Sequence, residues 1–151
     1  PPKNSGNWED ESRQKRFESF VEVYQDLKCE ALLLAHHSED VAETTLKRVF
    51  EKSSLEKLHG PKGIHQLLGM EVWRPLINTS KKMISKYVQE KFLSILEDST
   101  NKDLKFTRAR MRHQILPWLS KQFGKQVSGS LCHLAKQSCE IEEYFYEKLS
   151  P

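Results

Sequence analysis

The sequence predicts an α/β fold in which a parallel sheet is flanked by helices and is followed by an all-helical segment. A short apolar run at residues 31–35 is bounded by polar residues, which is typical of a strand buried on both faces of a parallel sheet. Segments of strand and helix pattern then alternate, whereas the residues after Gly124 have helical pattern only. We therefore expect two parts, residues 1–123 and residues 124–151.

The first elements follow from local patterns. Apolar and aromatic residues recur at helical spacing within residues 8–27, which predicts the first helix. The apolar run at 31–35 is the first expected strand, and two histidines follow it. Residues 38–50 are expected to form the next helix, with Ser38 as its N-cap and acidic residues in its first turn, where they suit the helix dipole.

The later elements follow from the same patterns. They are a loop at 60–63, a strand at 70–73, a helix capped by Thr79 or Ser80, a short strand at 94–96, a helix at 103–123 and a last helix at 131–149. Pro117 lies inside the helix at 103–123, and we expect it to interrupt or bend that helix because proline has no backbone N–H.

Composition narrows the class of protein. A chain of 151 residues is expected to hold one domain, or one domain with an appendage. Its formal net charge of +3 permits nucleic-acid binding without requiring it. The three cysteines form no CxxC pair, which argues against a disulfide framework or zinc knuckle and favours a reducing, cytoplasmic setting. No apolar run reaches the roughly 20 residues of a membrane helix, so we expect no membrane partner.

The strongest candidate for chemistry is the segment from His36 to Glu43. In open α/β sheets, ligands bind beyond the carboxyl ends of the strands, where these residues are expected to lie. Asp40 and Glu43 are three positions apart on a helix, so both carboxylates can face the same way and hold Mg²⁺ or an ammonium group. A neighbouring histidine can orient a phosphate or move a proton. The residues alone leave open the alternative that the acids only stabilise the helix N-terminus.

Arginines form a second group of candidates. Arg108, Arg110 and Arg112 alternate along the chain after an acidic turn at residues 97–101, and guanidinium groups there can pair with phosphates or with the acids. The alternative is a cluster of surface salt bridges. Several lysines have the same two readings, as contacts to an RNA backbone or as a solvated face: Lys81, Lys82, Lys86, Lys91, Lys102 and Lys105.

Taken in order, these segments resemble the catalytic domain of the tRNA(Ile)-lysidine synthetases, which belong to the PP-loop ATP pyrophosphatases. The matching motifs span about residues 10–120. They are Arg13-x-x-Arg16-Phe17, Ala35-His36-His37-Ser38-Glu39-Asp40-Val41-Ala42-Glu43-Thr44, Arg74-Pro75-Leu76, Glu97-Asp98-Ser99-Thr100-Asn101 and Phe106-Thr107-Arg108-Ala109-Arg110-Met111-Arg112 followed by Leu116-Pro117. Each motif alone is modest, and their order and spacing make the match specific.

The resemblance implies a fold similar to the adenine nucleotide alpha-hydrolases and a carbon–nitrogen ligase reaction. ATP adenylates carbon-2 of the wobble cytidine in a minor tRNA(Ile) with a CAU anticodon, and the ε-amine of L-lysine then displaces AMP. ATP and Mg²⁺ are the expected cofactors.

By the same resemblance each candidate residue receives an expected role. His36, Asp40 and Glu43 are expected to be catalytic, with Asp40 and Glu43 holding the lysine ammonium group. Glu39 and Asp40 are the expected Mg²⁺ ligands. Phosphate contacts are expected from Arg13, Arg16, Arg108, Arg110 and Arg112.

The sequence departs from the family pattern in several places. Glu39 stands where the family usually has Asp, and Ala109 where it usually has Asn. The family's Ser-Gly-Gly-x-Asp-Ser loop, whose backbone amides cradle the ATP phosphates, does not occur among these residues, and its place would be before residue 1. We therefore expect the chain as given to be inactive by itself and its incomplete sheet to expose an edge that can pair with a second copy.

Three alternatives stay open. The first is a related PP-loop enzyme such as a tRNA thiolase, although those typically need cysteine pairs. The second is a non-catalytic RNA-binding module of the same fold. The third is an interaction domain whose motifs are only helix caps and salt bridges.

Overall fold

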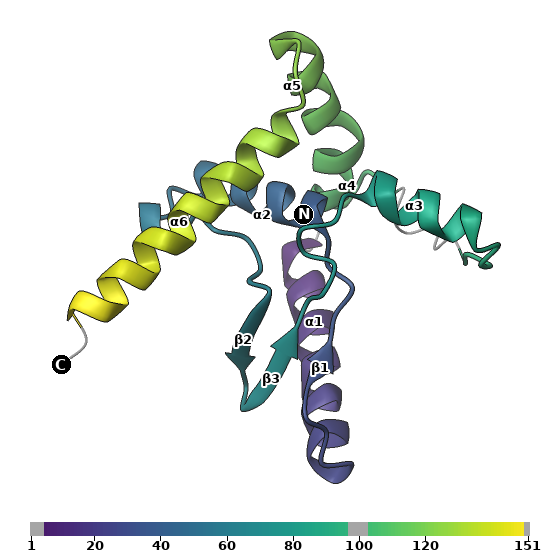
Figure 1. Ribbon diagram of the computed structural model, residues 1–151, viewed down its shortest axis with the longest axis vertical. Helices are drawn as coiled ribbons and strands as arrows, with labels where there is room; N and C mark the ends of the chain where they lie inside the picture. Colours follow the sequence, from purple (N-terminus) through teal and green to yellow (C-terminus); the bar gives the residue numbers. More distant parts are fainter. Residues whose placement is uncertain (1–4, 97–102, 150–151) are drawn as a thin grey trace. The chain divides into compact units, whose positions relative to one another are not determined.

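A computed structural model describes the backbone of residues 5–96 and 103–149, and the side chains of these ranges from residue 11 onward. The chain forms two compact units (Figure 1). The first unit comprises residues 1–35 and 63–75, and the second comprises residues 36–62 and 76–151. The predicted division into residues 1–123 and 124–151 stays a prediction.

The first unit combines one helix with a small mixed sheet. Its elements are α1 (Ser5–Asp26), β1 (Leu32–Leu33), β2 (Ile64–Leu67) and β3 (Met70–Trp73). The strand order is β1-β3-β2, with β1 parallel and β2 antiparallel to β3. The β2–β3 hairpin turns through Leu68 and Gly69, which both have positive φ. This conformation of a two-residue turn matches the right-handed twist of the two strands.

The sheet confirms the parallel prediction only in part. The strand at 70–73 was expected, and the strand expected at 31–35 is observed as the shorter β1, parallel to β3. β2 was not expected, because its Ile-His-Gln-Leu sequence is short and half polar. The short strand expected at residues 94–96 is wrong, since these residues have no regular secondary structure. β3 provides the interior of this unit through Met70 and Val72, which are both buried.

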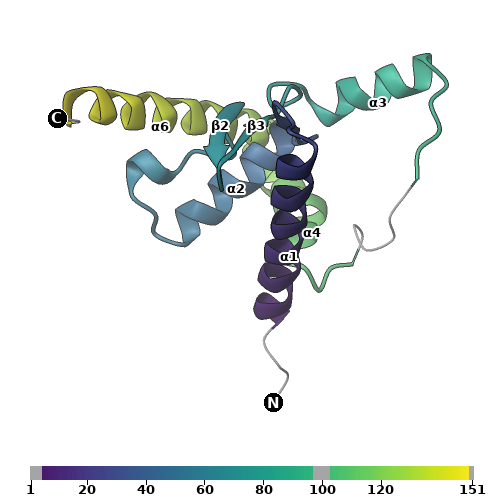
Figure 2. The same cartoon turned by 90° about the horizontal axis from the view of Figure 1, so that it is seen from below.

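The second unit is helical. Its elements are α2 (Ser38–Phe50), the 3-10 turn η1 (Leu55–Lys57), α3 (Lys81–Glu90), α4 (Thr107–Arg110), the π-helical turn η3 (Met111–Ile115), α5 (Leu116–Phe123) and α6 (Val127–Leu149). α2 packs against α6 (Figure 2). The buried centre of this contact contains Ala42 and Leu46 from α2, Leu116 from α5 and Leu131 from α6.

Local chemistry explains where these helices begin, end and bend. Ser80 caps α3, as predicted, by accepting a hydrogen bond from the Met83 N–H at 3.3 Å. α5 ends at Gly124, whose φ of 62° is the left-handed conformation that glycine adopts at little cost. The irregularity expected near Pro117 takes the form of η3. This π-helical turn is wider than an α-helical turn and lies just before the proline. No helix in the described part of the chain combines the length and the apolar character needed to cross a membrane.

Candidate functional site

The first turn of α2 holds two of the predicted site residues, Glu39 and Asp40, and Glu43 follows in the second turn. The helix begins after His37, whose extended backbone makes it the N-cap, one residue before the Ser38 that the sequence suggested. The Asp40 carboxylate turns back over the end of the helix, and its Oδ2 accepts the His37 N–H at 2.9 Å. An acid at this position satisfies a backbone N–H and also interacts favourably with the helix dipole.

Arg112 of η3 lies against two acids of α2. Its Nε donates to Glu43 Oε1 at 2.6 Å, and its Nη2 donates to Glu43 Oε2 at 3.1 Å and to Asp40 Oδ1 at 3.0 Å. Asp40 and Glu43 therefore face the same side of α2, as their spacing predicted. The planar guanidinium group matches the two oxygens of Glu43, a geometry that lysine cannot reproduce.

Burial makes the Arg112–Glu43 pair more than a surface ion pair. Glu43 is only 1% exposed, while the Arg112 side chain keeps 24% of its surface exposed. The hydrogen bond to Glu43 raises the pKa of Arg112, and although burial opposes this, the charges of Glu43 and Asp40 add to the increase. The charged guanidinium group thus provides the counter-charge for the buried Glu43 carboxylate and for its neighbour Asp40.

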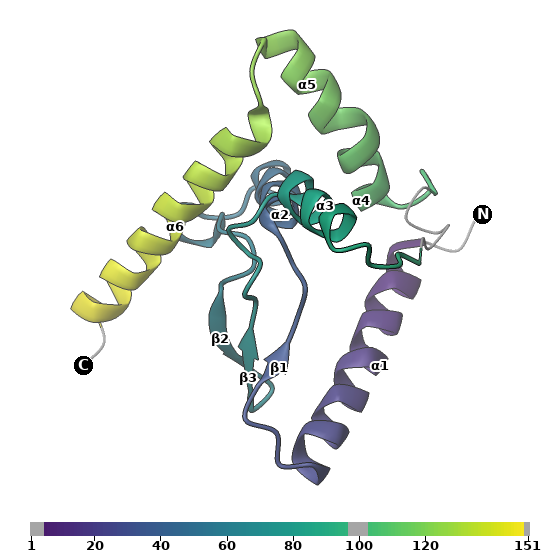
Figure 3. The ribbon, with the colours of Figure 1, turned by 45° about the vertical axis from the view of Figure 1, so that its right-hand side comes forward.

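Glu39 joins the start of α3 to the start of α2. Its Oε2 accepts the Lys81 N–H at 2.9 Å and the Ser38 hydroxyl at 3.1 Å, and it lies 3.0 Å from His37 Nδ1. Burial would raise the pKa of Glu39, but these hydrogen bonds and the nearby histidine outweigh it and hold the pKa below its ordinary value. The Ser38 N–H also donates to the Thr79 carbonyl at 3.1 Å, so two hydrogen bonds join the start of α2 to the residues at the start of α3. Figure 3 shows the two helices α2 and α3.

α6 and the loop after η1 support the site from behind. The Cys132 thiol of α6 donates to the Ser38 carbonyl at 3.2 Å. Buried Ser138, also on α6, accepts the His59 N–H at 2.9 Å. Next to it, Gly60 lies so close to α2 that an added Cβ would stand 2.9 Å from the Cα of Val41. These contacts fix the position of α2, and with it the two acids that bind Arg112.

A family profile for the PP-loop domain matches residues 2–119 of the chain. The chain belongs to the PP-loop domain family. The candidate site lies within the matched range, while the whole of α6 follows it.

Several proteins similar to this PP-loop chain have the name tRNA(Ile)-lysidine synthase. The one from Chlamydia muridarum is 35% identical over 150 residues, covering 99% of this chain and 47% of the relative. The one from Chlamydia felis is 36% identical over 153 residues, covering 100% of this chain and 48% of the relative. The one from Protochlamydia amoebophila is 35% identical over 147 residues, covering 97% of this chain and 32% of the relative. The chain thus spans about half the length of the Chlamydia relatives it matches.

The three alternating arginines of the PP-loop domain point to different environments. Arg112 binds the acids, as described above. Arg110 donates to the carbonyls of Leu104 and Lys105, at 3.0 and 2.7 Å, and so holds the segment before α4 in place. Arg108 is exposed. On an ideal helix Arg110 lies about 200° from Arg112, which directs it away from the acids, whereas Arg108 lies one turn before Arg112.

Arg13, Arg16 and His36 lie outside α2 and η3. Arg13 and Arg16 belong to α1 in the first unit, where Arg13 lies over the Phe17 ring with 5.1 Å to its centroid and Arg16 is exposed. His36 is half-buried, directly before the N-cap. The expected turn at residues 97–101 lies outside the described residues.

The acids of this PP-loop domain do not form a ready metal cage. Among the described residues, no three histidine, cysteine, aspartate or glutamate side chains converge as metal ligands would. Asp40 is occupied by Arg112 and the His37 N–H, and Glu39 Oε2 by the donors of the α2–α3 junction. The described residues thus form no Mg²⁺ site built from protein ligands alone, and the predicted role of Glu39 and Asp40 as Mg²⁺ ligands stays a prediction.

Sequence reasoning missed the positioning residues of the site. His37 contacts both Glu39 and Asp40, and its Nε2 lies 3.5 Å from Asp40 Oδ2, yet the prediction emphasised His36. The adjacent pair of histidines gave no signal as to which one would face the acids. The donor from Lys81 to Glu39 is a backbone N–H, so the pattern of side chains in the sequence could not predict this contact.

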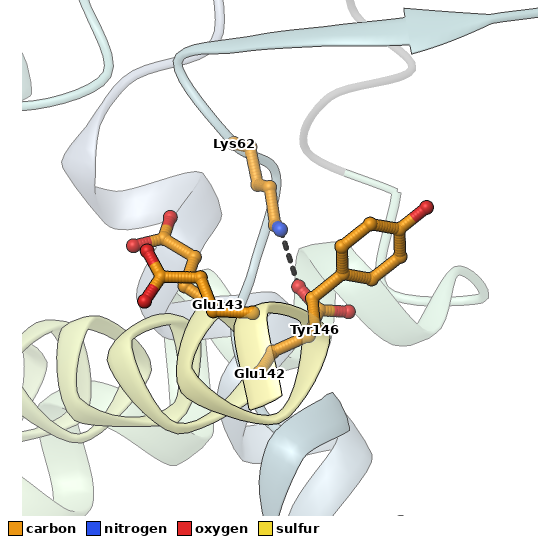
Figure 4. Close-up of a pocket in the computed structure, with 5 residues that line it drawn as sticks. Lys62, Glu142, Glu143 and Tyr146 are labelled. Atoms are coloured by element: carbon orange, nitrogen blue, oxygen red, sulfur yellow. Dashed lines mark ion pairs between the residues drawn. The ribbon is translucent and has the colours of Figure 1, made fainter. Parts of the chain in front are cut away.

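A second cluster of charged residues joins the loop after η1 to the far half of α6. Lys62 forms an ion pair with Glu142 (Figure 4), and Glu142 Oε1 also lies 3.4 Å from His59 Nε2. The hydrogen bond from Lys62 lowers the pKa of Glu142, and the same bond raises the pKa of Lys62. Glu143, Tyr146 and Glu147 complete the lining of a pocket here. The pairs of this cluster attach the loop to α6.

Proposed function

We propose that the protein is a tRNA(Ile)-lysidine synthase, a carbon–nitrogen ligase that modifies a tRNA at the expense of ATP. The observation that carries this proposal is the agreement among relatives of that name, which match 95–100% of the chain at about a third identical residues. Membership of the PP-loop domain family supports it, since the proposed chemistry consumes ATP.

The proposed reaction has two steps. The carbon-2 oxygen of the wobble cytidine in a tRNA(Ile) with a CAU anticodon attacks the α-phosphorus of ATP, and pyrophosphate leaves. The uncharged ε-amine of L-lysine then attacks carbon-2, and AMP leaves with the former cytidine oxygen. The amine must lose its proton before it attacks, and the phosphates carry negative charge throughout. The site therefore needs an acceptor for ammonium and donors for phosphate.

Asp40 and Glu43 are the proposed acceptors for the lysine ammonium group. The geometry supports a division of this role between them. Both oxygens of Glu43 accept hydrogen bonds from Arg112, and the side chain is almost completely buried, so Glu43 acts mainly by positioning Arg112. The Asp40 side chain keeps 13% of its surface exposed, and we propose that it is the acid that meets the ammonium group. His36, next to the N-cap, is the proposed contact to the nucleotide or the cytidine.

Phosphate contacts are proposed for the arginines. Arg112 combines a guanidinium group held charged by its acids with a partly exposed surface, so it suits a phosphate at the same site. Arg108 is exposed and suits a second contact. Arg110, Arg13 and Arg16 remain proposed phosphate ligands by family resemblance.

Mg²⁺ is proposed to bind together with ATP, since this ion is usually bound through one or two carboxylates together with substrate phosphates. We also propose a cytoplasmic location, and formation of a homodimer stays a prediction.

The proposal is tested by incubating the protein at its full natural length with radiolabelled lysine, ATP and a tRNA(Ile) transcript. We expect label in the tRNA with the CAU anticodon and none in a matched transcript with UAU, which lacks the cytidine. Asp40→Asn should raise the KM for lysine far more than the KM for ATP. Binding of the tRNA without incorporation of lysine would support the non-catalytic RNA-binding alternative instead.

A further inference from the structure

The exposed side of α3 combines lysines with an aromatic ring. Lys82 and Lys86 are one helical turn apart, and Met83 and Tyr87 form the adjacent row. The Lys86 side chain is 76% exposed, Met83 64% and Tyr87 57%. The helix contributes no buried residue to the described core. We call Lys82, Met83, Lys86, Tyr87 and Lys91 the α3 surface.

The charge of the α3 surface stands out from the rest of the chain. Residues 81–91 contain four lysines and one acid, Glu90, which lies 3.7 Å from Lys86. The whole chain has 24 basic and 21 acidic residues, so this single segment accounts for its net charge of +3. A local excess of positive charge on an otherwise neutral chain favours a polyanionic partner.

Tyr87 gives the α3 surface a second means of recognition. The Lys91 ammonium group lies over the Tyr87 ring, with 6.0 Å from Nζ to the centroid. An exposed ring next to cations can stack on an unpaired base while the cations contact the neighbouring phosphates.

The position of α3 connects this surface with the candidate active site. The Lys81 N–H donates to Glu39, and Thr79, just before the helix, accepts the Ser38 N–H. α3 therefore begins at the first turn of α2 and runs away from α2 and α6 (Figure 1). Its ten residues span about 15 Å at 1.5 Å per residue. An RNA that places one nucleotide at the site would have the flanking part of its strand within reach of the α3 surface.

We infer that the α3 surface binds the single-stranded nucleotides next to the modified position of the tRNA, with Lys82 and Lys86 on phosphates and Tyr87 stacked on a base. This inference rests on the proposed function for the identity of the RNA. It assigns a substrate-binding role to α3 that is separate from the binding of lysine and ATP.

The test compares two double variants of the full-length protein that remove equal charge. One is Lys82→Ala/Lys86→Ala. The control is Lys136→Ala/Lys148→Ala on α6, where Lys136 is 77% exposed and has a partner at i+4, as Lys86 has. Binding of the tRNA(Ile) transcript is measured by fluorescence anisotropy over a range of salt concentrations, and circular dichroism compares the folding of the variants.

We expect the α3 variant to weaken tRNA binding about tenfold and to reduce the slope of log Kd against log salt by about 0.7 to 0.9 for each lysine lost, with little change in the control. Tyr87→Ala should weaken binding, while Tyr87→Phe should retain it because the phenyl ring still stacks. The KM values for lysine and ATP should stay at the level of the parent protein.

Equal tRNA binding by the α3 variant and its control would overturn the inference. This is the result expected if another protein segment covers α3. Failure of the proposed function gives a different pattern, in which no lysine is transferred although the α3 variant still binds tRNA more weakly than the control. Absence of salt-dependent tRNA binding by the parent protein would overturn both.

Discussion

Both carboxylate oxygens of Glu43 accept hydrogen bonds from the guanidinium group of Arg112, a residue 69 positions later in the chain. One partner comes from the second turn of α2 and the other from the π-helical turn before α5. Because Asp40 also contacts Arg112, a single cation binds two of the acids of α2.

Loss of Arg112 should destabilise the protein. Arg112→Met leaves the Glu43 carboxylate buried without a counter-charge, and breaking a fully buried pair in this way costs roughly 3–5 kcal/mol. We expect about 2–3 kcal/mol here because Arg112 keeps 24% of its surface exposed. The urea midpoint of the full-length protein measures the effect. The same substitution in a Glu43→Gln background should cost much less, and equal costs in both backgrounds would show that the pair is not coupled.

Arg112→Lys should fail to restore what Arg112→Met loses in catalysis. A lysine supplies the charge but cannot donate to both oxygens of Glu43 and to Asp40 at once. We expect a larger loss in kcat/KM for lysine than in tRNA affinity, because the acids proposed to bind the ammonium group lose their position. Lysine transfer and tRNA binding, measured on the same preparation, separate the two effects. Loss of tRNA affinity alone would assign Arg112 to RNA binding.

The Glu39 carboxylate should contribute to stability in a pH-dependent way. Its folded pKa lies below its ordinary value of about 4.5, so folding favours the ionised form. The contribution is therefore fully present above the unfolded pKa and is lost as the pH falls through the lower folded pKa. Glu39→Gln should lower the urea midpoint near neutral pH, and the difference from the parent should shrink as the pH falls below the ordinary pKa of 4.5. A difference that does not change with pH would contradict this.

Ser138→Ala should loosen the contact between α6 and the loop before β2. Ser138 is fully buried, and its hydroxyl accepts the His59 N–H, so the alanine variant leaves that donor without its side-chain partner. Such a loss costs about 1–3 kcal/mol. Thermal unfolding checks the size of the effect, and Ser130→Ala, at an exposed position on the same helix, is the matched control. Equal melting temperatures of the two variants would exclude this role.

Gly60→Ala should move the loop between η1 and β2 away from α2. Its added Cβ would stand 2.9 Å from the Val41 Cα and 3.1 Å from the Val41 carbonyl oxygen, and backbone atoms cannot rotate away as a side chain can. We expect a lower unfolding midpoint and weaker lysine transfer, because Val41 lies between Asp40 and the core of α2. Gly129→Ala, where the added Cβ meets nothing within 4 Å, is the control and should be neutral or slightly stabilising. A neutral Gly60→Ala would show that the loop can move aside.

The sequence allowed prediction of the elements whose information is local. α2 was predicted within its observed bounds, and the Ser80 cap of α3 was among the two candidates, because periodicity and capping depend on neighbouring residues. The spacing of Asp40 and Glu43 also predicted that they share a helix face. The family resemblance added the PP-loop assignment, which the profile match confirms.

What could not be predicted depends on tertiary contacts. Nothing local distinguishes Arg112, which reaches two acids of α2, from Arg110, which binds the carbonyls of its own segment. The antiparallel strand β2 exists because β3 pairs with it, since its own sequence is too short and polar to signal a strand. His37 rather than Ser38 is the N-cap because its backbone N–H meets Asp40.

The most direct test of the account is nucleoside mass spectrometry of tRNA(Ile) after reaction with the full-length protein, lysine and ATP. We predict that the first anticodon cytidine gains one lysine with loss of one water, and that AMP and pyrophosphate form in equal amounts with the product. An unmodified cytidine at this position, with folded protein and intact tRNA, would contradict the account.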